Sequence, residues 1–129
     1  MSIHIFIKEK IMKVAECQER KIHEERMENA KKELLRVEDI EKVCNIFRML
    51  AETSRMKIVL ALTKGESCVY HLVGVCGGTQ SGMSHQLRVL KDNGIVKARR
   101  DGQNMLYSLA DEHIVKIVEF ARAHKDCKE

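Results

Sequence analysis

Proline is absent from this sequence, and aromatic residues make up only 4% of its 129 residues. Both features favour helices over a β-sandwich, because sandwich strands draw on aromatic side chains and on turns rich in glycine and proline. Charged residues make up 33% and hydrophobic residues 44% of the chain, which is typical of a globular protein with long charged helices. The length predicts one compact domain with a moderate core.

Long apolar runs and a regular cysteine framework are also missing. The opening run IHIFI is too short for a signal peptide or a membrane span, and the charged Lys8 comes soon after it. We therefore expect a reduced cytoplasmic protein that does not associate with membranes and whose thiols are free or bind metal. The cysteines are odd in number and irregularly spaced: Cys17, Cys44, Cys68, Cys76 and Cys127.

The first third of the chain is rich in charge of both signs. Residues 1–42 contain ten basic and ten acidic side chains, and residues 8–36 contain no glycine. This balance is typical of a solvated helix with ion pairs between successive turns. We expect residues 1–36 to form a charged N-terminal helical extension. Two alternatives stay open, namely a frayed extension and a helix that packs on a partner subunit.

Helical periodicity strengthens in the middle of the chain. Residues 43–50 place apolar side chains three and four positions apart, as on one face of an amphipathic helix. The next helix has the apolar body MKIVLAL, with a cap expected at Thr53 or Ser54 and an end at Gly65. The segment ESCVYHLVGVC comes next as a short helix, and the glycine pair at 77–78 breaks it.

A further helix is expected to begin at Thr79 or Ser81 and to end at Asn93-Gly94. Its inward positions are apolar: Met83, Leu87 and Leu90. The stretch IVKARRDGQNMLYSL then alternates between apolar and polar residues, and Asp101-Gly102 marks a turn, which predicts a β-hairpin.

A last helix is expected after Ala110. Two short helices around a glycine-bearing turn, succeeded by a hairpin, are the elements of a winged helix-turn-helix. We therefore predict a chain that is mainly α with one β-hairpin. Residues 37–127 would form a winged helix-turn-helix domain that binds DNA and senses metal, and it would dimerise through its N- and C-terminal helices.

The helix in TQSGMSHQLRVLKDNGIV carries small hydroxyls, amides and a basic group on its outer face, which suit the phosphates and base edges of a major groove. Between residues 79 and 107, five basic side chains stand against two acidic ones, so most of the chain's net charge of +4 lies here. Such concentration indicates contact with DNA, and the hairpin tip can reach an adjacent minor groove. The predicted DNA-binding residues are Thr79, Gln80, Ser81, Ser84, His85, Arg88, Arg99, Arg100, Gln103 and Asn104.

The last helix carries four potential metal ligands: Asp111, His113, His124 and Cys127. The histidines are eleven residues apart, so they share one face of the helix but lie about 16 Å apart along its axis. Zinc–nitrogen bonds are about 2 Å long, so the imidazoles of one helix cannot share an ion. An antiparallel pair of these helices in a homodimer would bring the aspartate and first histidine of one subunit to the second histidine and the cysteine of its partner, giving two identical sites.

Asp111 and His113 are close in sequence, and they suit a shared ion only if Asp111 lies at or before the first turn, as an N-cap. One oxygen, two nitrogens and one sulfur suit tetrahedral Zn²⁺, with Co²⁺, Cd²⁺ and Ni²⁺ as competitors. The alternative is a solvated helix whose histidines bind nothing. In a dimer, the helix's apolar stripe would form the seam between the two sites: Ile114, Ile117, Val118 and Ala121.

The segment SGMSHQLRVLKDNGIVKARRDGQNMLYSL resembles the recognition helix and wing of the ArsR/SmtB family of bacterial metal-responsive repressors. FRMLAETSRMKIVLAL is similar to that family's entry segment, without the usual proline near Thr53. The resemblance covers about residues 38–127 and implies a winged-helix homodimer that leaves operator DNA when it binds its inducer. The family's terminal-helix pattern, D-x-H-x10-H-x2-E or H, matches Asp111, His113 and His124, while Cys127 stands in the fourth place and softens the site.

A second family site uses a Cys-x-Cys pair in the helix before the turn. Here Tyr70 replaces the partner of Cys68, so a soft-metal site would be irregular and would join Cys68 to His71 and Cys17. The alternative is that Cys68 is a small packed residue, as we expect for the cysteines at 44 and 76.

Two other functions are considered on the same residues. One is a redox- or thiol-responsive repressor on this scaffold, for which no close cysteine pair is evident. The other is a small metalloenzyme, for which neither a separate general base nor a substrate cleft is evident. We therefore predict a repressor without enzymatic activity, whose partners are operator double-stranded DNA and a second copy of itself.

Overall fold

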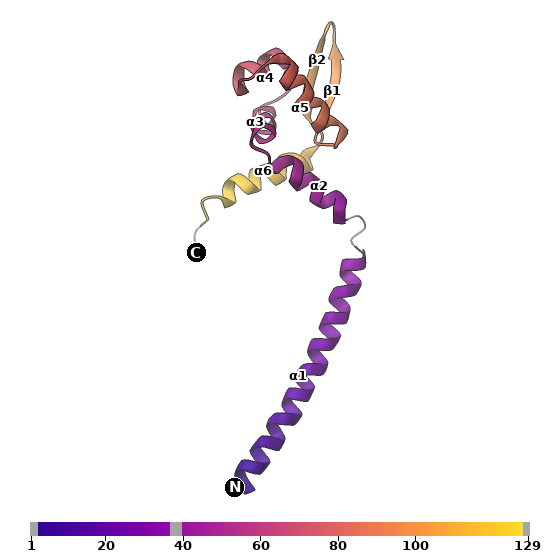
Figure 1. The fold of residues 1–129 in the computed structure, drawn as a ribbon, viewed down its shortest axis with the longest axis vertical. Coiled ribbons are helices and arrows are strands. Elements are labelled where there is room, and N and C mark those ends of the chain that lie inside the picture. Colours follow the sequence, from indigo (N-terminus) through magenta and orange to yellow (C-terminus); the bar gives the residue numbers. More distant parts are fainter. Residues whose placement is uncertain (1–2, 37–39, 128–129) are drawn as a thin grey trace. The chain divides into compact units, whose positions relative to one another are not determined.

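The computed structural model describes residues 3–36 and 40–127. The chain divides into two compact units, residues 1–40 and 41–129 (Figure 1). The first helix is α1 (Ile3–Arg36), and the predicted domain boundary after residue 36 stays a prediction. None of the helices formed by the described residues combines the length and the apolar character needed to cross a membrane.

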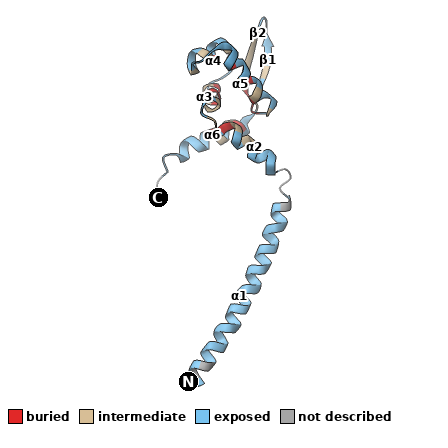
Figure 2. Ribbon diagram, viewed as in Figure 1, coloured by how far each residue is buried: buried red, intermediate tan, exposed pale blue. Residues whose placement is uncertain are grey.

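The first unit contains the 34-residue helix α1, as the charge pattern predicts. Its described side chains are exposed along the whole helix, including the apolar Ile11 and Ile22 (Figure 2). Ion pairs one turn apart support it: Arg36 lies 3.2 Å from Glu33, and a second pair joins positions 31 and 28. The packing of α1 on a partner subunit stays a prediction.

The second unit contains five helices and a hairpin. They are α2 (Ile40–Ala51), α3 (Thr53–Leu62), α4 (Val69–Cys76), α5 (Gln80–Asp92), β1 (Val96–Asp101), β2 (Asn104–Leu109) and α6 (Glu112–His124). The core gathers apolar side chains from all of them, and the buried residues in Figure 2 lie in this unit. The three predicted inward positions of α5, Met83, Leu87 and Leu90, are buried. The period of apolar residues therefore identified the inner face of α5 correctly.

The break between α4 and α5 is as predicted. Gly77 and Gly78 have φ angles of 85° and 89°, in the left-handed region that side chains disfavour. Thr79 then caps α5, and its hydroxyl accepts the N–H of Gly82 at 3.0 Å. These local features fix where α5 begins relative to α4.

The start of α3 differs from the prediction by one residue. The N-cap is Glu52 rather than Thr53 or Ser54, and its carboxylate accepts the backbone N–H groups of Ser54 at 3.0 Å and Arg55 at 2.9 Å. Glu52 takes this role because its extended backbone lets the side chain reach forward to the N–H groups of the first turn. These hydrogen bonds stabilise the ionised form and hold the pKa of Glu52 below its ordinary value.

The hairpin turn is also displaced by one residue. Asp101 pairs with Asn104 in the antiparallel ladder, so the loop is Gly102–Gln103 rather than Asp101-Gly102. Gly102 has a φ of 62°, which suits a two-residue hairpin loop. Consequently Gln103 is at the tip, whereas Asn104 already belongs to β2.

The terminal helix packs against the chain's own core. Ile114 and Val118 are 5% and 1% exposed, so they cannot form the seam of a dimer as predicted. The periodicity correctly identified an apolar face, but that face is covered within one subunit by β2 and the other core residues. A large apolar side chain of this helix, Phe120, is 72% exposed, and Ala121 of the predicted seam is exposed too.

Candidate nucleic-acid interface and metal ligands

The outer face of α5 is polar and open to solvent. Met83 and Leu87 hold the helix against the core, which leaves the intervening positions facing outward. All ten residues predicted to bind DNA are exposed: Thr79, Gln80, Ser81, Ser84, His85, Arg88, Arg99, Arg100, Gln103 and Asn104. An exposed helix with hydroxyl, amide and basic groups, beside a projecting hairpin, has the parts of a groove-reading surface.

The hydroxyl of Thr79 already has structural partners. Besides accepting from Gly82, its Oγ1 lies 3.3 Å from the Oγ of Ser81. A Cβ at Gly82 would lie 3.1 Å from Thr79 Oγ1, which is a close approach that a side chain would disturb. Thr79 therefore orders the first turn of α5, and the exposed Gln80 and Ser81 begin its outward face.

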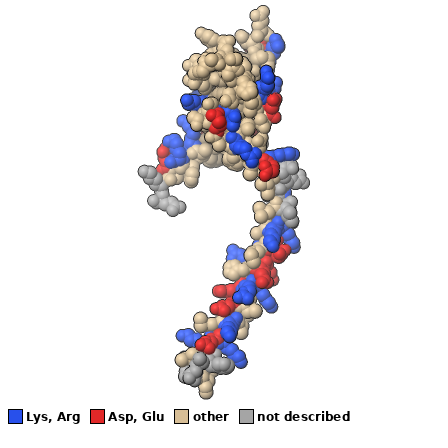
Figure 3. All heavy atoms as spheres, in the orientation of Figure 1, with Lys and Arg blue, Asp and Glu red and all other residues tan. Residues whose placement is uncertain are grey.

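The hairpin carries basic side chains, and Figure 3 shows blue Lys and Arg atoms on the side of this unit that bears it. One of them is engaged by a residue that the sequence reasoning missed. Arg99 donates from Nε to Glu66 Oε2 at 2.7 Å and from Nη2 to Glu66 Oε1 at 2.8 Å. Glu66 lies in the loop between α3 and α4, 33 positions away, so no local pattern could have revealed the pair.

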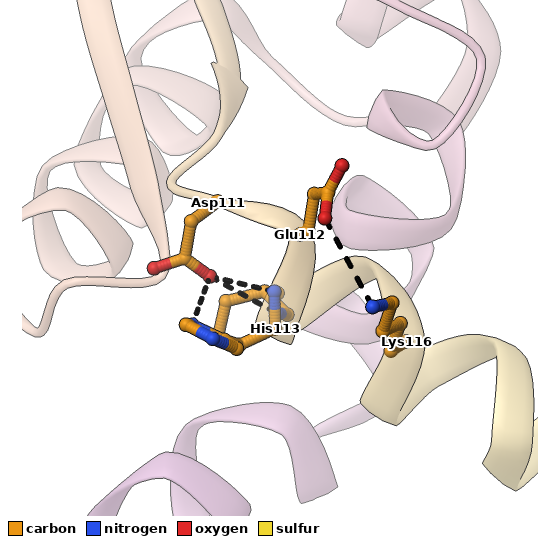
Figure 4. A network of polar contacts seen from close by, with 5 residues as sticks. Asp111, Glu112, His113 and Lys116 are labelled. Carbon is orange, nitrogen blue, oxygen red and sulfur yellow. Dashed lines mark hydrogen bonds and ion pairs between the residues drawn. The ribbon is translucent and has the colours of Figure 1, made fainter.

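Asp111 is the N-cap of α6, as the proposed ligand geometry requires. Its Oδ1 accepts the N–H of His113 at 2.9 Å and that of Ile114 at 3.3 Å. These hydrogen bonds, with the nearby imidazole, hold the pKa of Asp111 below its usual value. Figure 4 shows the carboxylate turned toward the His113 ring, with Asp111 Oδ1 3.3 Å from His113 Nδ1. The two side chains, 54% and 87% exposed, are therefore close enough to share an ion.

The other two predicted ligands lie at the far end of the same helix. His124 is the last residue of α6, and Cys127 comes after it in a turn, where its N–H donates to the His124 carbonyl at 2.9 Å. Cys127 is therefore not on the helical face assumed from its spacing, because α6 ends three residues earlier. Both side chains are exposed.

The two ends of α6 do not meet within one chain. The helix α6 is unbroken over its 13 residues, so His113 and His124, eleven positions apart, lie about 16 Å apart along its axis. Among the described residues of a single chain, no three His, Cys, Asp or Glu side chains come together as a metal site. The donor set, one oxygen, two nitrogens and a sulfur, suits a tetrahedral divalent ion only if two chains contribute to it.

The residues of the predicted second site belong to both units, and this site stays a prediction. Cys68 is half-buried at the N-cap of α4, His71 is exposed, and Cys17 lies on α1 in the other unit. Cys76 is partly buried and burial raises the pKa of its thiol, in keeping with a packing role. Cys44 is exposed, so the expectation that it packs inside the subunit is wrong. Its neighbour on α2, Val43, is exposed too, so the single chain leaves the outer face of this helix uncovered.

The sequence matches proteins of one regulatory family. Residues 52–98 match the family model described as bacterial regulatory protein, arsR family. A cadmium resistance transcriptional regulatory protein CadC homolog from Staphylococcus aureus is 36% identical over 110 residues, which cover 84% of this chain and 90% of that protein. A transcriptional repressor SmtB homolog from Synechocystis sp. is 32% identical over 108 residues, which cover 84% and 82% respectively.

Solved structures agree with the fold. The homodimeric winged helix-turn-helix DNA-binding domain Mb0332 from Mycobacterium bovis superposes with a TM-score of 0.64 at 28% identity, covering 74% of this chain and 84% of that one. The transcriptional repressor BigR from Xylella fastidiosa has a TM-score of 0.60 at 29% identity, covering 82% and 98%. The predicted winged helix-turn-helix, mainly α with one hairpin, is thereby confirmed, as is the family resemblance.

Proposed function

Because the chain belongs to the arsR family of bacterial regulatory proteins, we propose that it is a metal-responsive transcriptional repressor of the cytoplasm. It binds operator DNA as a homodimer and leaves it when a divalent metal, Zn²⁺ foremost, binds at α6. The observation that carries this proposal is the pairing of Asp111 with His113 at one end of α6, far from His124 at the other. Relatives named as repressors, and a homodimeric solved relative, support repression and dimerisation.

DNA binding is assigned to α5 and the hairpin. In a dimer with two-fold symmetry, two copies of α5 can enter successive major grooves of an operator whose halves repeat the same symmetry. The exposed Gln80, Ser84 and Arg88 offer amide, hydroxyl and guanidinium groups to base edges and phosphates. The basic hairpin adds contacts to the sugar–phosphate backbone, so affinity falls as salt rises.

Metal binding is assigned to two copies of α6. Asp111 and His113 of one subunit would face the partner's His124 and Cys127, which makes two equivalent sites per dimer. The N-cap geometry fits this assignment because it points the carboxylate and the imidazole to the same place. These four side chains would hold a divalent ion that cross-links the two chains, with Co²⁺, Cd²⁺ and Ni²⁺ as competitors of Zn²⁺.

The ligands couple the two functions through the dimer. When the two terminal helices are held together, the spacing of the two α5 helices is fixed in an arrangement that no longer fits the operator. Such coupling between sites amounts to about 1–3 kcal/mol in typical allosteric proteins. Protons compete for the imidazole nitrogens and the thiolate, so sensing weakens as the pH falls.

The test uses a fluorescent duplex selected from a random-sequence pool by chelator-treated protein. Addition of Zn²⁺ should lower its affinity for the dimer by roughly 5–150-fold, as measured by anisotropy. His85→Ala is the matched control: it should weaken DNA binding but leave the metal stoichiometry unchanged. Zinc that fills the sites without changing DNA affinity would overturn the proposal. Sensitivity of chelator-treated protein to peroxide would instead favour the thiol-responsive alternative.

A further inference from the structure

Two neighbouring arginines of the hairpin, Arg99 and Arg100, point to opposite faces of β1. Successive side chains alternate along a strand, and residues directly paired across an antiparallel ladder share a face. The core face is marked by buried Val96 and its partner Leu109. Arg100 lies on that face, beyond the edge of the core, whereas Arg99 lies on the outer one with its partner Leu106.

The loop before α4 lies along the other edge of β2. Ser67 and Tyr107 exchange two backbone hydrogen bonds, of 3.0 Å and 2.9 Å, in an isolated antiparallel bridge. This pairing places Glu66 beside β2, on the same outer face as Arg99, and the ion pair between them spans that strand. The pair therefore joins three segments: the loop, β2 and β1.

The carboxylate of Glu66 occupies one whole edge of the Arg99 guanidinium. Nε and Nη2, the two parallel donors of that edge, both donate to it, at 2.7 Å and 2.8 Å. A phosphate that formed a bidentate hydrogen bond with arginine would need such a pair of donors. The pair also lowers the pKa of Glu66 and raises that of Arg99, so both stay charged. Arg100, in contrast, is exposed, and no hydrogen bond or ion pair is found for it among the described residues.

We propose that the two arginines have different tasks: Arg100 is the hairpin's contact with a DNA phosphate, and Arg99 is a positioning residue that braces the hairpin through Glu66. The inference rests on the proposed DNA binding. By tying β1 to the loop that leads into α4, the Glu66–Arg99 pair fixes the hairpin relative to the helix-turn-helix. A hairpin held in this way loses less freedom when it binds DNA.

The salt dependence of operator binding separates the two tasks. Arg100→Gln should weaken binding and reduce the slope of log affinity against log salt by about 1, the loss expected for one phosphate contact. Arg99→Gln, the matched control one residue away, should weaken binding with the slope nearly unchanged. The opposite result, with the slope reduced by Arg99→Gln alone, would overturn the assignment.

Exchanging the two charges tests whether the Glu66–Arg99 pair positions the hairpin, because the double variant has the same net charge as wild type. Arg99→Glu places two carboxylates together and should lower operator affinity by about tenfold or more. The double variant Glu66→Arg with Arg99→Glu restores an opposite-charge pair and should return affinity to within about threefold of wild type. A double variant as weak as Arg99→Glu, yet equally stable to heat, would show that the guanidinium at 99 itself touches DNA and would contradict the brace.

A measurement without DNA separates this inference from the proposed function. In the free protein, the ¹⁵N NMR signal of the Arg99 Nε–H should move and broaden in Glu66→Gln, while that of Arg100 should not. Wild-type protein that shows the brace but no sequence preference among duplexes would refute operator binding and leave the brace intact. An Arg99 signal that is unaffected by Glu66→Gln would refute the brace alone.

Discussion

The helices α5 and α6 have the same length, 13 residues, and each begins at a side-chain cap, yet they are supported differently. The buried residues of α5 run almost to its end, because Leu90 is fully buried two residues before Asp92. The last buried residue of α6 is Val118, and every residue from position 119 to 127 is exposed. The core of the same chain therefore covers α5 over nearly its whole length. In the part of the chain that the structure describes, it covers only the first half of α6.

This contrast suggests where each function can be performed. The core of a single subunit already fixes the outward face of α5. One subunit would therefore present the surface proposed to contact one half of an operator. The candidate ligands lie at the two ends of α6, only the first of which is packed on the core, so the proposed metal sensing would need a second subunit. A repressor built in this way can couple metal to DNA because the partner that completes the metal site also sets the spacing of the two α5 helices.

The largest effect, on the free energy of unfolding, is expected where α5 packs against the core. Leu87→Ala removes a fully buried side chain and should lower the free energy of unfolding by about 2–5 kcal/mol in urea titrations. Glu119→Ala, at an exposed position of α6, is the matched control and should change it by less than about 0.5 kcal/mol. Equal losses in the two variants would mean that the helices are equally supported.

A smaller effect is expected at the unsupported end of α6. Phe120 is 72% exposed, and burying a phenylalanine contributes about 1.5–3 kcal/mol, so Phe120→Ala should raise the dimer dissociation constant by roughly 10–100-fold. Sedimentation equilibrium measures this constant directly. Tyr70→Ala, 78% exposed on α4, serves as the control and should leave it unchanged. An unchanged dissociation constant in Phe120→Ala would place the interface elsewhere.

Periodicity predicted the inner faces of both helices but not what covers them. The apolar spacing of Leu87 and Leu90 and that of Ile114 and Val118 look alike in sequence, and all four residues are buried in their own subunit. The assignment of Ile114 and Val118 to a dimer seam was wrong because a pattern of apolar residues does not identify the surface that buries it, whereas Ala121 of the same stripe is exposed and its place in a seam stays a prediction. Phe120, outside that stripe, carried no periodic signal.

Short-range chemistry was predicted more accurately than long-range pairing. The caps at Thr79 and Asp111 were predictable from residue types that favour the N-cap, whereas Glu52 took a cap that serine and threonine usually provide. Asp101-Gly102 and Gly102–Gln103 are both acceptable loops, so the register needed the ladder itself. The Glu66–Arg99 pair depends on the fold, which brings residues 33 apart together.

The smallest effect is expected at the start of α6, where Asp111 is both the N-cap and a proposed metal ligand. Asp111→Asn should keep the cap, since asparagine also accepts backbone hydrogen bonds, but should weaken zinc binding. Asp111→Ala should lose both, which circular dichroism and metal titration can separate. Wild-type zinc affinity in Asp111→Asn would remove the carboxylate from the ligand set.

The same residue gives a pH dependence of stability. Because the pKa of Asp111 is lowered in the folded state, its stabilising contribution is present above the pKa of the unfolded chain. That contribution is lost as the pH falls through the lowered folded-state value. Asp111→Asn should therefore lose less stability than wild type between neutral and acidic pH in thermal unfolding. If both proteins lost the same stability between neutral and acidic pH, the ionised form of Asp111 would not be what stabilises the N-cap.

The most direct test of a shared metal site mixes two defective proteins. His113→Ala and His124→Ala each remove one imidazole, and each homodimer alone should bind zinc poorly. Unfolding and refolding them together forms heterodimers in which one of the two symmetric sites has both histidines, so tight zinc binding should return at one ion per heterodimer. If the mixture binds no better than the separate variants, or if wild-type monomers bind zinc tightly, the ligands do not come from two chains.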